Sequence, residues 1–133
     1  MKPKTIESIN SNAQIKMNLK ENTHISKTYK SLQREMIDFI ELGEADYTIA
    51  DVNKCLSLLD NFLEEISKTD SRETGILAVK KTVLAINNLN ENCEYELVET
   101  EQREKIADII ILAGHLKGYN HINEDTTEEW REW

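Results

Sequence analysis

The chain has 133 residues and a net charge of −9, and it contains only four glycines and one proline. A chain of this length forms one domain that can bury a core without disulfide bonds. So few turn-forming residues argue against an all-β fold and favour helices joined by short polar connections. The 31% charged fraction is high for a globular protein, and it predicts a strongly solvated surface.

Several classes of protein are disfavoured by composition. No run of residues approaches the ~20 apolar residues of a membrane span, and no apolar signal segment follows the N-terminal lysines. Two cysteines, Cys55 and Cys93, give no disulfide framework. An acidic surface disfavours nucleic acid, whose phosphates need Lys and Arg. We therefore expect a cytoplasmic protein that binds neither membrane nor nucleic acid.

The N-terminal part is the least patterned. Residues 1–22 carry a thin apolar stripe among asparagines and serines, which predicts an arm or a loosely docked helix. Residues 23–133 are expected to form a single helical-bundle domain. Its first main helix is predicted at about 26–42, where Ser26 can cap the start and Gly43 follows the end.

Two further helices follow at short intervals. The second is predicted at about 48–67, because Thr48 can cap its start and apolar residues then recur every three or four positions. The third is predicted at about 71–91. Asp70 precedes it and has capping-box spacing to Glu73, which indicates a helix start.

The fourth helix holds the densest apolar cluster of the chain. Three consecutive isoleucines, at 109–111, would also suit a buried strand, since β-branched side chains favour extended structure. Thr100 as a cap and Gly118 as a stop nevertheless favour a helix at about 100–117. Because apolar residues cover so much of its circumference, we expect this helix to be central.

These elements predict an all-α, antiparallel bundle of four main helices. The short connections at 43–47 and 68–70 require antiparallel neighbours. Residues 90–99 are expected to be a loop, since a single extended piece has no partner strand. The N-terminal arm or extra helix, and a short C-terminal helical turn from about residue 126, should pack outside the bundle.

Both tryptophans lie in the C-terminal tail. Trp130 and Trp133 are three positions apart, so they would share a face in a helical turn. They can pack on their own domain, which is the favoured interpretation, or anchor a partner, because Trp is enriched at binding hot spots. A docked tail could also form a homodimer contact.

The leading hypothesis for function is a non-enzymatic protein-interaction module. Residues 91–133 carry a net charge of −8, which would attract a basic partner. By class alone, small acidic helical proteins of this kind resemble bacterial immunity and antitoxin proteins, which cover basic toxins. We expect no cofactor and assign no catalytic residue. The candidate partner-binding residues are Trp130, Trp133, Glu101, Glu104, Glu128 and Glu129.

Two alternatives stay open. One is a metal-dependent all-α hydrolase with helix-borne carboxylates, loosely suggested by acidic groups at 64–65 and 101–108; the required spacing is missing, so no metal ligand is assigned. His115 and His121 likewise lack a ligand set. The other alternative is a homo-oligomeric scaffold that uses the tryptophan tail.

Overall fold

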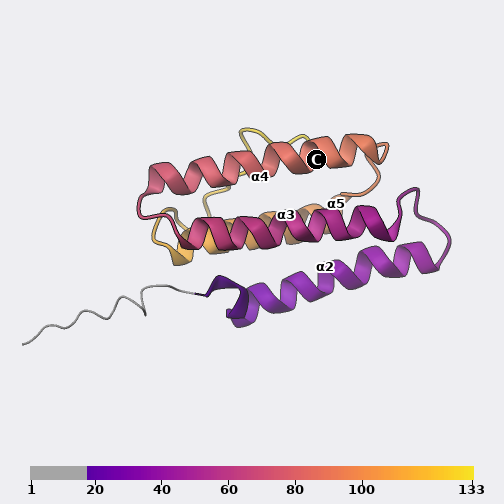
Figure 1. The fold of residues 1–133 in the computed structure, drawn as a ribbon, viewed down its shortest axis with the longest axis horizontal. Coiled ribbons are helices and arrows are strands. Elements are labelled where there is room, and N and C mark those ends of the chain that lie inside the picture. Colours follow the sequence, from indigo (N-terminus) through magenta and orange to yellow (C-terminus); the bar gives the residue numbers. More distant parts are fainter. Residues whose placement is uncertain (1–17) are drawn as a thin grey trace, which may run out of the picture.

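The computed structural model describes residues 18–133, and every regular element in that part of the chain is a helix (Figure 1). The predicted all-α bundle of four main helices is therefore confirmed. Residues 1–17 of the predicted N-terminal arm lie outside the described residues. The elements are η1 (Leu19–Glu21), α2 (Thr23–Glu41), α3 (Ile49–Ser67), α4 (Arg72–Asn92) and α5 (Thr100–Leu116).

The four long helices run antiparallel to their chain neighbours. Helix α3 packs against α4 on one side and α2 on the other, while α5 packs against α2 and α3. The α2–α3 and α4–α5 connections consequently lie at the same end of the bundle, on the right in Figure 1. The α3–α4 connection lies at the opposite end.

The start of α2 differs from the prediction. The helix begins at Thr23, and the side chain of Asn22 caps it by accepting a hydrogen bond of 3.0 Å from the Ile25 N–H. Ser26 lies inside the first turn. Asparagine caps a helix as well as serine does, and the earlier start buries Ile25 in the core. The predicted stop is confirmed, since Gly43 follows the helix with φ +76°.

The start of α3 agrees with the prediction. The Thr48 hydroxyl accepts a hydrogen bond of 3.3 Å from the Asp51 N–H, and the Asp51 carboxylate accepts one of 2.9 Å from the Thr48 N–H. These two bonds form a capping box, which satisfies two of the free donors at the helix start.

The N-cap residues of α4 and α5 each differ from the predicted residue by one position. Ser71, rather than Asp70, caps α4 by accepting a hydrogen bond of 3.2 Å from the Thr74 N–H. Helix α5 begins at Thr100, with Glu99 as its N-cap residue. In both places the helix itself begins within one residue of the predicted position.

The predicted fourth helix forms as α5 and not as a strand, but the helix in the centre is α3, which packs against η1, α2, α4 and α5. Ile106, Ile109 and Ile110 are each 0% exposed, and they join a single cluster with the apolar faces of the other helices. Full burial of each such side chain stabilises the fold by about 1.5–3 kcal/mol. Members of the cluster from the other helices include Leu32, Met36, Leu59, Phe62, Ile66, Val83 and Ile86.

We predict that Thr48→Ala lowers the free energy of unfolding by about 1 kcal/mol, because it removes one side of the capping box. Urea unfolding followed by circular dichroism measures this change. Ser26→Ala is the matched control. It lies within α2 and should change stability by less than about 0.5 kcal/mol; an equal loss in both variants would contradict the assignment of the caps.

Candidate protein-binding surface

Most of the protein's net charge gathers at one end of the bundle. Residues 41–54 and 91–104 contain ten Asp and Glu but only two Lys and Arg, a net charge of −8 out of −9 overall. We call this the acidic end. It contains the ends of α2 and α4 and the beginnings of α3 and α5 (Figure 1). Two helix C-termini and two N-termini largely cancel each other's dipoles, so the side chains set the potential.

The carboxylates of the acidic end are not neutralised within residues 18–133. Seven ion pairs are present there, and none includes an Asp or Glu of the acidic end. Typical pairs, such as Lys105 with Glu35 at 2.5 Å, lie farther along the helices. The acidic end therefore presents a concentrated negative field to solvent.

Carboxyl groups from the two connections at this end influence each other. Glu96 of the α4–α5 loop lies against Asp46 of the α2–α3 loop. A hydrogen bond with Asp46 and the repulsion of its charge raise the pKa of the Glu96 carboxyl above its ordinary value, and Glu99 and Glu94 add to the repulsion.

Large apolar side chains are exposed at the same end. Phe39 in the last turn of α2 is 39% exposed, Leu42 after it is 71% exposed, and Tyr95 is 59% exposed. Tyr95 points outward from a tight turn in which Glu94 and Tyr95 both have positive φ, while the loop is fixed by the Val98 N–H donating to Asn90 Oδ1 at 2.9 Å. Apolar groups ringed by charge are typical of protein-binding surfaces.

A pocket of about 310 Å³ opens beside these groups. It lies between the last turn of α2 and the first turn of α5. Two aromatic side chains and three carboxylates contribute to its walls, and Glu101 is one of the latter. The lining residues are Phe39, Tyr47, Glu96, Glu99, Thr100, Glu101 and Gln102.

The tryptophan tail lies on its own domain. Trp133 is 9% exposed and belongs to the core cluster, and Trp130 packs against that cluster. Asn87 of α4 holds the tail at two points, since its Nδ2 donates to the Trp130 carbonyl at 2.8 Å and its Oδ1 accepts from the Glu132 N–H at 3.0 Å. Lys80 lies over the Trp130 ring at 5.8 Å. The favoured interpretation, docking on the domain, therefore agrees with the structure.

The earlier part of the tail also contacts α4. Arg72 pairs with Glu124 at 2.8 Å, and the Tyr119 ring packs against Gly75, where a side chain would collide with it. The predicted C-terminal turn is present as a single turn, in which the Trp130 and Arg131 N–H groups donate to the Thr127 carbonyl.

The six predicted partner-binding residues thus fall in two places. Glu101 and Glu104 are exposed on α5 at the acidic end, whereas Glu128 and Glu129 are exposed on the tail with the two tryptophans. Their role in binding stays a prediction. Phe39, Tyr95 and the Asp46–Glu96 pair were not among the predicted residues.

The carboxylates considered for a hydrolase are not brought together. Glu64 and Glu65 of α3 form ion pairs with Lys68 and Lys81 respectively. Asp108 of α5 lies elsewhere, with its Oδ2 2.7 Å from His24 Nε2. Within residues 18–133, no group of three or more His, Cys, Asp or Glu could hold a metal ion.

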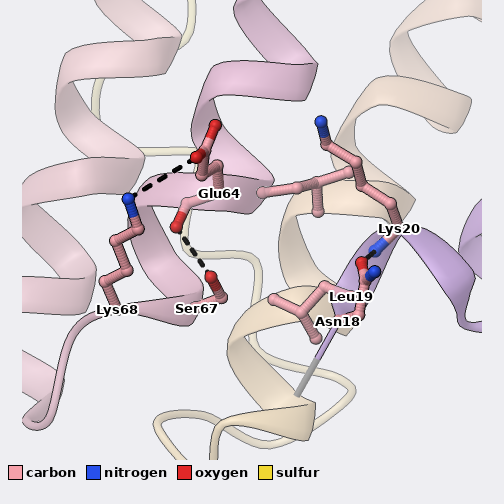
Figure 2. Close-up of a pocket in the computed structure, with 7 residues that line it drawn as sticks. Asn18, Leu19, Lys20, Glu64, Ser67 and Lys68 are labelled. Atoms are coloured by element: carbon pink, nitrogen blue, oxygen red, sulfur yellow. Dashed lines mark hydrogen bonds and ion pairs between the residues drawn. The ribbon is translucent and has the colours of Figure 1, made fainter. Parts of the chain in front are cut away.

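A second pocket lies between η1 and the end of α3, and several of the polar groups that line it bond to one another (Figure 2). Lys68 Nζ lies 3.5 Å from Glu64 Oε2, the Ser67 hydroxyl donates to the Glu64 carbonyl at 2.7 Å, and the Lys20 N–H donates to Asn18 Oδ1 at 3.2 Å. No set of polar groups converges on its interior in Figure 2, so it offers no clear ligand chemistry.

Comparisons with protein-family models, with curated proteins and with solved structures find no significant match for this chain. In residues 18–133, no helix has both the length and the apolar character that crossing a bilayer requires. Evidence on function therefore comes from the surfaces described above.

We predict that Asn87→Ala loosens the tail and lowers the free energy of unfolding by about 1–3 kcal/mol, because two backbone groups lose their partner. The two tryptophans are the only ones in the chain, so their fluorescence reports on the tail. We expect red-shifted emission in the variant. Asn88→Ala changes the exposed neighbouring residue and should do neither; identical spectra for all three proteins would contradict the docking.

We also predict a pH-dependent gain in stability from Glu96→Gln. The folded state holds the Glu96 proton more tightly than the unfolded state, so stability falls as pH rises through the raised pKa. The variant avoids this loss. Its melting temperature should exceed that of the wild type at pH 7, and the difference should shrink toward pH 4. Glu129→Gln, on the exposed tail, should show no such trend.

Proposed function

We propose that the protein is a non-enzymatic interaction module that binds a basic protein partner through its acidic end. The observation that carries this proposal is the coincidence of a net charge of −8 with exposed apolar side chains at one end of the bundle. Charge of this density attracts and orients a basic partner, and apolar groups give contacts that exclude water.

The state of the carboxylates supports this function over simple solubility. A surface that serves solubility alone usually intersperses charges of both signs, and elsewhere in residues 18–133 acids do form ion pairs with bases. At the acidic end they repel one another, as Asp46 and Glu96 do. A basic partner would relieve that repulsion. An inhibitor that covers a basic toxin, as immunity-type proteins do, is one protein of this kind.

The test uses two variants with equal net charge. The acidic-end variant carries Glu44→Lys, Glu94→Lys and Glu101→Lys, and the tail variant carries Glu128→Lys, Glu129→Lys and Glu132→Lys. A partner is first captured from an extract of the source cells on wild-type protein, and its equilibrium binding to each variant is then measured. All six side chains are exposed, so both variants should fold.

We expect the acidic-end variant to bind the partner about thirtyfold more weakly, or worse, and the tail variant to bind within about threefold of wild type. Binding should also weaken as salt rises from 50 to 300 mM. Equal losses in both variants would show only a dependence on net charge, and a loss confined to the tail variant would place the interface on the tail. Either result would overturn the proposed surface.

A further inference from the structure

The pocket at the acidic end has walls that suit an organic cation. The residues that line it are Phe39 of α2, Tyr47 of the α2–α3 connection, and three acids at or just before the start of α5, namely Glu96, Glu99 and Glu101. Phe39 is the exposed ring of this set, while Tyr47 is 6% exposed. The face of an aromatic ring attracts a cation, and carboxylates form strong hydrogen bonds with one. The exposed part of Phe39 also offers apolar surface for the methylene groups of a long side chain.

The pocket is preformed by contacts beneath it. Gln102 donates through Nε2 to Glu35 of α2 at 3.1 Å, and its Oε1 accepts from the Glu99 N–H at 3.1 Å. Lys105 pairs with the same Glu35. The Tyr47 ring is 6% exposed, so its position is set by packing. These contacts hold the start of α5 against α2, so the backbone around the pocket needs little rearrangement on binding.

We propose that this pocket receives an arginine side chain from the protein partner, presented on a segment whose apolar residues pack against Phe39, Leu42 and Tyr95. The inference rests on the proposed function, because it names the chemistry of the segment that the acidic end binds. The proposed function needs only a negative potential at the acidic end, whereas this inference needs a defined pocket.

Arginine fits these walls better than other cations. Its planar guanidinium stacks on rings, bonds to a carboxylate at two points and is weakly hydrated, whereas the lysine ammonium is a compact, strongly hydrated charge. A bare metal ion needs ligands that converge, and residues 18–133 contain no such cluster. The start of α5 contributes roughly half a positive charge, which three carboxylates outweigh.

The repulsion between loops gives a second reason for a cation here. The negative charges of Asp46 and Glu99 both raise the pKa of the Glu96 carboxyl, which lines the pocket. A guanidinium beside Glu96 would offset this repulsion directly. Binding of the guanidinium should therefore stabilise the folded protein, because the repulsion between these negative charges is unrelieved in the free protein.

The test uses three small probes on the whole chain, with backbone amide shifts recorded by NMR. N-acetyl-arginine amide should bind with a dissociation constant on the order of 1 mM and shift residues 96–102 and Tyr47. N-acetyl-lysine amide should bind severalfold more weakly. N-acetyl-citrulline amide has nearly the same shape as the arginine probe without its charge, and it should not bind.

Two matched variants locate the site. Glu101→Gln removes a carboxylate that lines the pocket and should weaken arginine binding about fivefold. Glu73→Gln, at an exposed position at the start of α4 and so at the opposite end of the bundle, should change it less than twofold. Their spectra without probe confirm that both fold. Equal binding of arginine and lysine, absence of saturation, or equal effects of the two variants would overturn the pocket. In those cases the proposed function stands if the acidic-end variant still loses the partner, and falls if it does not.

Discussion

The burial of α5 against α2 and α3 is the interaction on which the other features depend. Ile106, Ile109 and Ile110 are withdrawn from water in the middle of the bundle, at about 1.5–3 kcal/mol for each side chain. Two exposed charges 4 Å apart in water repel by only about 1 kcal/mol. The packing of one apolar helix therefore outweighs the repulsion it creates when it brings the acidic start of α5 up to the end of α2.

This balance explains how one end of the molecule can remain electrostatically unfavourable. The α2–α3 and α4–α5 connections are placed by core packing, by the Asn90–Val98 hydrogen bond and by the Glu35–Gln102 contact. None of these interactions depends on the charges of Asp46 or Glu96. Apart from Asp51, which completes the capping box of α3, the carboxylates at the acidic end make none of these stabilising contacts, so their arrangement is free to serve binding.

Local sequence patterns predict the helices of this protein but not its candidate binding surface. Helical periodicity located all four helices to within three residues at each end, because a buried stripe has to recur at that spacing. The observed start of α2 differs from the prediction because Asn22 and Ser26 can both cap a helix, and local sequence does not show that the earlier start buries Ile25. Glu101 was assigned from charge alone. Phe39, Tyr95 and the Asp46–Glu96 pair depend on two connections 50 residues apart meeting in space.

The predicted topology nevertheless implies that these two connections lie close together. In an antiparallel bundle the first and third connections lie at the same end, so the acidic residues around 41–51 and 91–104 had to add together. The predicted topology and the charges of these two connections together therefore imply an acidic end. The tail offers no comparable pattern, because its docking depends on Asn87, a polar residue whose two hydrogen bonds to the backbone of Trp130 and Glu132 carry no periodic signal.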